Sequence, residues 1–134
     1  MKIRKATKKD LNKLIWLDKK ANKEIKWWTP LTKSGFMNFL KRNKLLFIAE
    51  YKGIIIGYQS ATLGDKTLKL EDIYIRKEFR NKKIATKLIK KAILKAKRYN
   101  INQIRLDCPK RLRKFYEKLG FKVTSLIMSK KATP

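Results

Sequence analysis

The sequence contains no histidine, and among its 134 residues it has one cysteine, Cys108. The lack of histidine excludes Ser–His and Cys–His nucleophilic pairs and a histidine general base. It also removes a ligand that most zinc sites use, so we expect no metal. A single cysteine excludes an internal disulfide. Any acid–base chemistry must therefore use carboxylates, tyrosines, water or the backbone.

Acidic residues are also scarce, with 10 Asp and Glu against 37 Lys and Arg and a net charge of +27. Most of the basic side chains repel one another, and such a surface attracts polyanions. One interpretation is a composition rich in lysine and isoleucine throughout, which we favour for the average charge because the lysines are spread along the chain. The other is a surface that binds nucleic acid, a ribosome or an acidic protein. A continuous basic ridge at helical spacing supports it: Lys87, Lys91, Lys95 and Arg98.

Long apolar runs are missing too. None approaches the ~18 residues of a membrane span, and the basic start at residues 1–6 is not followed by an apolar segment typical of a signal peptide. We therefore expect a cytoplasmic protein. The length suits a single domain, residues 1–134, which can bury roughly two-thirds of its unfolded surface.

The hydrophobic pattern predicts a mixed sheet. Two turn signals, Lys52-Gly53 and Gly64-Asp65, separate three runs that predict consecutive antiparallel strands at residues 45–51, 54–63 and 67–75. Further strands are predicted at residues 2–6, 103–107 and, as one or two short closing strands, 121–130. The strand at 103–107 follows a helix and should run parallel to the strand before that helix.

Helical periodicity predicts four helices around this sheet, at residues 7–22, 33–42, 83–99 and 109–120. Pro109 suits the first turn of the last helix. The fold class is therefore α+β, with a mixed, mostly antiparallel sheet flanked by helices on both faces.

Two segments carry the chemistry. Residues 70–85 read Leu-Glu-Asp-Ile-Tyr-Ile-Arg-Lys-Glu-Phe-Arg-Asn-Lys-Lys-Ile-Ala: an apolar strand with two carboxylates, then a basic loop that opens a helix. The free amides and positive dipole end of that helix predict a diphosphate site. Residues 115–121, Phe-Tyr-Glu-Lys-Leu-Gly-Phe, place a tyrosine one turn before a helix stop. Together they indicate group transfer from a phosphate-bearing cofactor.

These segments resemble the GNAT superfamily of acetyl-CoA-dependent N-acetyltransferases, and the order of the predicted elements fits that family over most of the chain. The family's cofactor loop reads Arg or Gln, two residues, Gly, any residue, then Gly or Ala. Here Arg80 begins the motif, Ala85 ends it, and Lys83 replaces the first glycine. The resemblance implies that acetyl-CoA contacts the loop: Arg80, Asn81, Lys82, Lys83, Ile84, Ala85 and Thr86. The Lys83 side chain would crowd the diphosphate, or its ammonium would add a contact.

The resemblance also implies roles around the strand at 67–75. The Leu-Glu-Asp triplet at residues 70–72 is similar to the spermidine/spermine acetyltransferase branch. This implies Glu71 as the base that accepts the amine proton and Asp72 as an anchor for a cationic substrate. As neighbours on a strand, the two should point to opposite faces; the alternative role is pairing with a lysine. The amides of Ile73 and Ile75 would polarise the acetyl carbonyl.

Two aromatic positions complete the expected site. Tyr116 matches the tyrosine that faces the cofactor sulfur in the family, which implies that it donates a proton to the leaving thiolate; the alternative is a core tyrosine. Trp27 and Trp28 fall on a loop that commonly lines the acceptor site, or they anchor that loop to the core. Pro109 replaces an asparagine common in the family, so the contact made by that side chain is lost.

The sequence thus predicts an N-acetyltransferase that moves the acetyl group from acetyl-CoA to a primary amine by direct attack in a ternary complex. The acceptor is a protein N-terminus, a lysine or a small amine. The +27 charge argues against a free polyamine unless Glu71 and Asp72 form a local acidic pocket. The alternative is a catalytically reduced GNAT-fold module that binds nucleic acid or a ribosome, and a nucleic-acid-associated acetylase would combine both.

Overall fold

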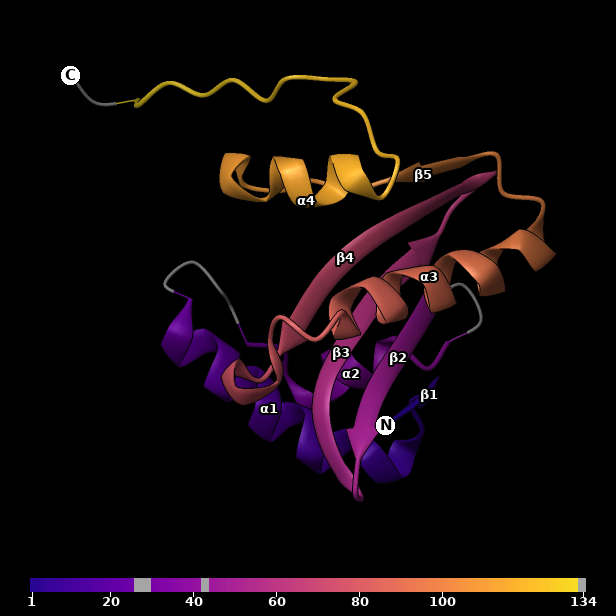
Figure 1. The fold of residues 1–134 in the computed structure, drawn as a ribbon, viewed down its shortest axis with the longest axis vertical. Coiled ribbons are helices and arrows are strands. Elements are labelled where there is room, and N and C mark those ends of the chain that lie inside the picture. Colours follow the sequence, from indigo (N-terminus) through magenta and orange to yellow (C-terminus); the bar gives the residue numbers. More distant parts are fainter. Residues whose placement is uncertain (26–29, 42–43, 133–134) are drawn as a thin grey trace.

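The computed structural model describes residues 1–25, 30–41 and 44–132. These residues form a five-stranded sheet in the order β1-β2-β3-β4-β5 (Figure 1). Neighbouring strands are antiparallel except β4 and β5, which are parallel as predicted. The strands are β1 (Lys2–Lys5), β2 (Lys44–Tyr51), β3 (Ile54–Leu63), β4 (Thr67–Ile75) and β5 (Gln103–Arg105).

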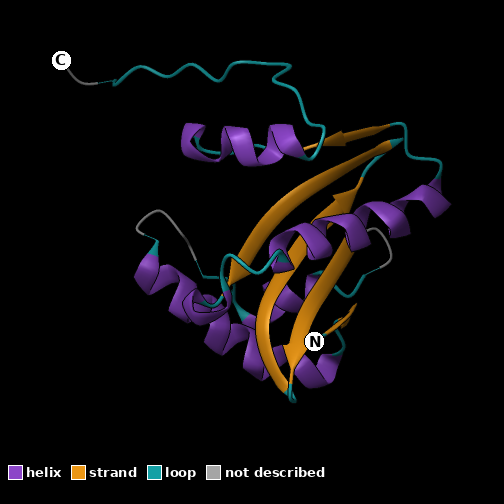
Figure 2. Cartoon of the chain, viewed as in Figure 1, coloured by secondary structure: helices purple, strands orange, loops and turns teal. Residues whose placement is uncertain are grey.

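Helices cover both faces of the sheet, which confirms the predicted α+β architecture (Figures 1 and 2). The helices α1 (Leu11–Glu24) and α2 (Lys33–Asn38) enclose one apolar core, and α3 (Ile84–Ala96) and α4 (Arg113–Lys118) enclose the other. The second predicted helix was expected to reach residue 42, but α2 ends at Asn38. Pro109 caps a short 3-10 turn, Lys110–Leu112, before α4 instead of lying in the first turn of that helix.

An extra residue in β4 changes the direction of two side chains. Gln59 pairs with Ile73 and Ala61 pairs with Leu70, so two steps along β3 correspond to three along β4. This β-bulge contains Glu71 and Asp72.

Two side chains of β3 show where the bulge residues point. Tyr58 and Thr62, four residues apart, share the α1 face of β3, because the Tyr58 hydroxyl donates to Asp18 of α1. Thr62 donates to the Glu71 carboxylate, and Asp72 lies close enough to Asp18 to feel its charge. Both carboxylates therefore lie on the α1 face, and the prediction that they point to opposite faces was wrong.

β4 is paired along only part of its outer edge. Its pairing with β5 covers Thr67–Lys69, and in the described part of the chain residues 70–75 have no strand beside them on that side. The Arg76 amide donates to the Ile56 carbonyl of β3 at 2.8 Å. Because antiparallel ladders alternate, the amides of Ile73 and Ile75 then point away from β3. The open edge thus presents the two amides that the sequence singled out.

The segment after α4 is extended and forms no strand within residues 121–132, so the prediction of closing strands at 121–130 was wrong. Its apolar side chains Leu126, Ile127 and Met128 are 83–89% exposed. High strand propensity does not produce a strand unless another strand supplies hydrogen bonds and packing. In Figure 1 this segment runs along α4 on the side away from the sheet.

Candidate active site

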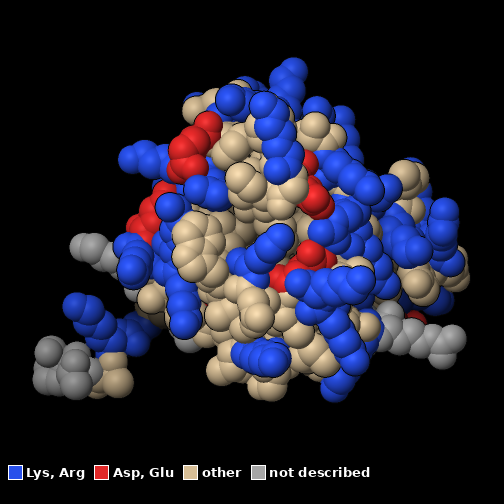
Figure 3. Space-filling model, turned by 90° about the horizontal axis from the view of Figure 1, so that it is seen from below, with Lys and Arg blue, Asp and Glu red and all other residues tan. Residues whose placement is uncertain are grey.

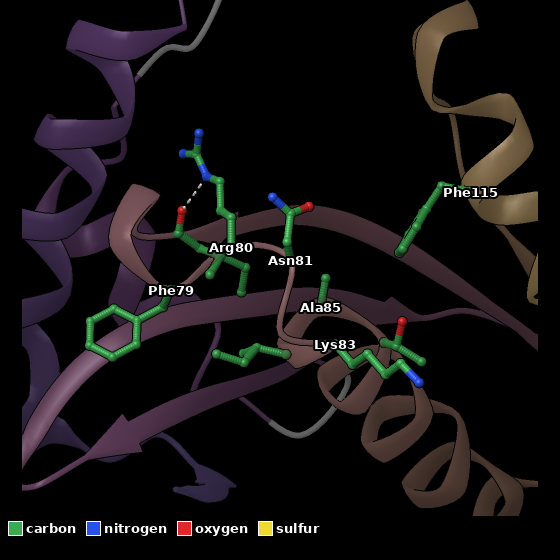
Figure 4. A pocket seen from close by; sticks show the side chains of 9 residues that line it. Phe79, Arg80, Asn81, Lys83, Ala85 and Phe115 are labelled. Atoms are coloured by element: carbon green, nitrogen blue, oxygen red, sulfur yellow. Dashed lines mark hydrogen bonds between the residues drawn. The ribbon is translucent and has the colours of Figure 1, made fainter.

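A pocket of about 340 Å³ lies at the beginning of α3 (Figure 4). Its walls come from the end of β4, the loop before α3, the first turn of α3 and one side chain of α4. They are Ile75, Phe79, Arg80, Asn81, Lys83, Ile84, Ala85, Thr86 and Phe115. These described residues include cations and no carboxylate, so the pocket suits an anion.

Two loop residues adopt the left-handed backbone conformation that favours glycine. Asn81 has φ 61° and Lys83 has φ 63°, and Lys83 caps α3 directly. This conformation explains why the motif prefers glycine at the position of Lys83. It also turns the chain so that the amides of Ile84, Ala85 and Thr86 begin a 13-residue helix at the pocket wall. A helix start of this kind binds phosphate through its free amides and its dipole.

The pocket differs from the predicted cofactor set in four residues. Lys82 and Ile73 do not line it: the Lys82 ammonium lies 5.6 Å from the centroid of the Phe79 ring, and Ile73 packs against the core. Phe79 and Phe115 do line it, although the sequence had not singled them out for this site. Large aromatic side chains in a loop and in a helix end are common in cores, so their types alone carried no signal.

Arg80 lines the pocket, but its guanidinium points toward α1. The Nε atom of Arg80 donates to the Ile75 carbonyl at 2.9 Å, and its Nη1 atom lies 2.5 Å from Glu24 Oε1. The central carbon of the guanidinium, Cζ, lies 5.5 Å from the centroid of the Tyr74 ring. Figure 4 shows the Arg80 side chain leaving the loop, with its hydrogen bond drawn as a dashed line. The sequence predicted Arg80 as a cofactor contact, and in this structure the guanidinium is already engaged.

A group of carboxylates lies on the α1 face of β4. Asp18 is 1% exposed and accepts hydrogen bonds from the Tyr58 hydroxyl at 2.5 Å and from the Leu31 amide at 2.7 Å. Asp72 is partly buried, and no described residue donates a hydrogen bond to its carboxylate. Burial raises the pKa of Asp72 above its usual range, and the charges of Asp18 and Glu71 add to the effect. Glu71 is exposed and accepts from Thr62 at 3.0 Å.

Tyr116 is buried on the opposite face, in the core formed with α3. Its ring contacts Phe115 and Phe121 edge-on, with centroids 5.0 and 5.8 Å apart. No described residue bonds its hydroxyl. Burial raises the pKa of Tyr116, with a smaller contribution from Cys108, so the phenol holds its proton at neutral pH. Its neighbour Phe115 reaches the pocket, which places α4 beside the site.

Comparison with known proteins identifies this arrangement. The model of the acetyltransferase (GNAT) domain matches residues 18–132. The chain belongs to the GNAT acetyltransferase family. It is an acetyl-CoA-dependent N-acetyltransferase with acetyl-CoA as co-substrate. No curated protein matches it by sequence.

Solved structures share the fold of this acetyltransferase. A predicted acetyltransferase from Clostridium acetobutylicum with acetyl-CoA superposes with a TM-score of 0.81 at 23% identity, over 97% of this chain and 95% of that one. The glucosamine-6-phosphate N-acetyltransferase of Arabidopsis thaliana gives 0.79 at 23% identity, over 98% and 97%. An aminoglycoside N-acetyltransferase in complex with CoA gives 0.77 at 19% identity, over 99% and 100%.

The residues of this GNAT domain fit the diphosphate of acetyl-CoA. The pocket joins the α3 amides to a cationic side chain, Lys83, and it continues to Ile75 at the end of the open edge of β4. A thioester arm laid along that edge would meet the outward amides of Ile73 and Ile75. The described helices of the acetyltransferase include none long and apolar enough to cross a membrane.

Sequence reasoning missed two acidic residues of this acetyltransferase. Asp18 lies on the buried stripe of α1 with Leu14 and Leu17, and a charged residue at an apolar position was a usable signal. Glu24 contacts Arg80, 56 residues away, and nothing in the local sequence indicates this. Trp27 and Trp28 lie outside the described residues.

Proposed function

We propose that this acetyltransferase acetylates a primary amine by direct attack in a ternary complex, with the amine approaching from the α1 face of β4. The observation that carries the proposal is the position of the open edge of β4. One end of this edge meets the diphosphate pocket, and the other lies beside the bulge that carries Glu71 and Asp72.

A carboxylate of the bulge takes the amine proton. An amine is protonated at neutral pH and must lose a proton before it can attack. The resemblance assigned this step to Glu71, whereas partial burial favours Asp72, because burial raises the pKa of Asp72 and makes it a stronger base than an ordinary carboxylate. Glu71, exposed and bonded to Thr62, then serves as the anchor for the positive charge of the substrate.

The remaining steps use the open edge and α4. The amides of Ile73 and Ile75 stabilise the negative charge that develops on the acetyl oxygen. As the new C–N bond forms and the C–S bond breaks, Tyr116 donates its proton to the departing sulfur and regains one from solvent. The carboxylate passes the first amine proton to water and then takes the second from the nitrogen as the amide forms. Because Tyr116 regains one proton, the reaction releases one proton to solvent overall.

The acceptor is a small amine with a second positive charge. Asp18, Glu71 and Asp72 form an acidic group on a chain of net charge +27, and Figure 3 shows how far basic side chains cover one face of the molecule. Such a local group meets the condition under which a basic protein can accept a polycation.

An amine panel tests this proposal. Linear diamines, monoamines of equal length, a lysine-containing peptide and a free peptide N-terminus would be compared by thiol release from acetyl-CoA. The diamine should have the highest kcat/KM, and Glu71→Gln should reduce its advantage over the monoamine. Equal kcat/KM for diamine and monoamine, or a clear preference for the peptides, would remove the small-cation assignment and leave the transferase activity intact.

A second function, nonspecific nucleic acid binding, is favoured by the ridge on α3 and the turn after it. Lys87, Lys91, Lys95 and Arg98 form no ion pair with a described residue, so their charge is available to phosphates. Binding to a duplex should weaken steeply with salt, and each ridge residue changed to Gln should lower the salt slope by about 1. A slope unaffected by these changes would dismiss the ridge as the binding surface.

A further inference from the structure

Glu24, the last residue of α1, uses both carboxylate oxygens to hold parts of the cofactor side of the molecule. Oε1 contacts Arg80 Nη1 at 2.5 Å, and Oε2 accepts from the Tyr74 hydroxyl at 2.6 Å. Tyr74 lies on β4 and Arg80 begins the loop before α3, residues 80–83, so one side chain joins α1, β4 and that loop. The Arg80 hydrogen bond lowers the pKa of Glu24, so the carboxylate is ionised at neutral pH.

Arg80 is fixed from three directions. Glu24 binds one end of its guanidinium, the Ile75 carbonyl accepts from Nε at 2.9 Å, and the Tyr74 ring lies beneath it. Five of the nine residues that line the pocket follow directly: Asn81, Lys83, Ile84, Ala85 and Thr86. The placement of Arg80 therefore sets where the segment that leads into α3 begins and where its amides point.

We propose that Glu24 is a positioning residue for acetyl-CoA. By holding the Arg80 guanidinium against the end of β4, it keeps the loop in the conformation that binds the diphosphate through backbone amides. Arg80 then acts through its position and leaves the anion to the α3 amides and Lys83. The proposal concerns binding of the co-substrate and holds whatever the acceptor is.

An alternative role for Arg80, direct binding of the diphosphate, makes a different prediction for Glu24 variants. If the Arg80 guanidinium bound the diphosphate itself, Glu24 would compete with the ligand, and removing its charge would tighten binding. Simple electrostatics also predicts tighter binding of an anion after loss of an acidic charge. Weaker binding in a Glu24 variant would therefore run against the charge effect and reveal the positioning role.

Calorimetric binding of desulfo-CoA to Glu24→Gln provides the test, because it reads the cofactor site without turnover. We expect the Kd for desulfo-CoA to rise about fivefold to tenfold, and we expect this rise to persist at high salt. The matched control is Glu78→Gln, which removes the same charge from the neighbouring ion pair with Arg76 (3.3 Å). Its Kd should stay the same or fall. An unchanged or lower Kd in Glu24→Gln would overturn the proposal.

A double-mutant cycle shows whether Glu24 acts through Arg80. Arg80→Gln alone should weaken binding as much as Arg80→Gln combined with Glu24→Gln. Once Arg80 is replaced, the contact between Glu24 and Arg80 is already lost, so the Glu24 change has nothing more to remove. Additive losses would contradict the proposal. Glu24→Asp, which keeps the charge and shortens the side chain, should also raise Kd and serves where Glu24→Gln unfolds. Thermal unfolding without ligand separates a loss of fold from a loss of loop placement.

Discussion

The two ends of the open edge of β4 carry opposite charge. At the end near α3, the pocket presents helix amides and Lys83 without a described carboxylate. Along the bulge and α1, three of the chain's ten acidic residues gather: Asp18, Glu71 and Asp72. The contrast suits a reaction that joins an anionic donor to a cationic acceptor.

On each side of this charge contrast, one residue that we propose to act in the reaction lowers the stability of the fold. On the acidic side, Asp72 is partly buried and free of described donors, which costs folding free energy and yields a stronger base. On the other side, Lys83 accepts a backbone conformation that is unfavourable for a lysine. Strain at functional sites is expected where surrounding structure fixes it. Each side can therefore be tested by a substitution that improves stability.

The largest effect should come from Asp72→Asn. We expect kcat/KM for the amine to fall roughly 100-fold or more, as for loss of a general base. In the wild type, activity should decline as pH falls through the raised pKa of Asp72, above the usual aspartate range, and the variant should lose this limb. The measurement is the pH profile of kcat/KM.

Folding stability provides the control for that variant. Because the folded state raises the pKa of Asp72, its ionisation costs stability as pH rises through that value, and asparagine avoids the cost. The unfolding temperature at neutral pH should therefore stay the same or increase while activity falls. A Glu71→Gln variant that loses more activity than Asp72→Asn would return the role of base to Glu71.

A smaller loss is expected for Tyr116→Phe. The ring contacts with Phe115 and Phe121 remain, so the fold should persist, while the proton donor for the sulfur is lost. We expect kcat to fall about 10-fold to 100-fold with little change in KM for acetyl-CoA. Wild-type kcat in this variant would show that Tyr116 is a core residue. Phe115→Leu should instead affect KM, because Phe115 lines the pocket.

Much of the fold follows from the sequence because its signals are local. Gly53 at φ 77° makes the turn between β2 and β3, and the helix between β4 and β5 predicted that these two strands run parallel. Most of the residues that line the pocket before α3 were also named from the sequence, since their motif is contiguous. The bulge was not, because an extra residue in β4 is defined only by its pairing with β3. Glu24 was missed for the same reason, since its partners lie far away in sequence.

A stability loss is expected for Asp18→Asn, which tests the acidic side without touching substrate. Asp18 is buried and accepts from Tyr58 and Leu31, and an amide is a weaker acceptor than a carboxylate. We expect unfolding free energy to fall by about 1–3 kcal/mol. The acidic limb of the pH profile should move to lower pH, because one charge that raises the pKa of Asp72 is gone. An unmoved limb would mean that Asp72 does not set it.

The smallest effect, and the one that tests the basic side, is Lys83→Gly. Relief of the left-handed conformation at φ 63° should stabilise the protein by about 0.5–1 kcal/mol after the entropy cost of glycine. Lys82→Gly is the matched control: Lys82 is not among the positive-φ residues, so the same change should not stabilise the protein.

Binding of CoA to the Lys83→Gly variant separates the two possible roles of the Lys83 side chain. If its ammonium contacts the diphosphate, the variant binds more weakly at low salt and nearly as well at high salt. Tighter binding at every salt concentration would instead show that the lysine side chain obstructs the approach of the ligand to the backbone.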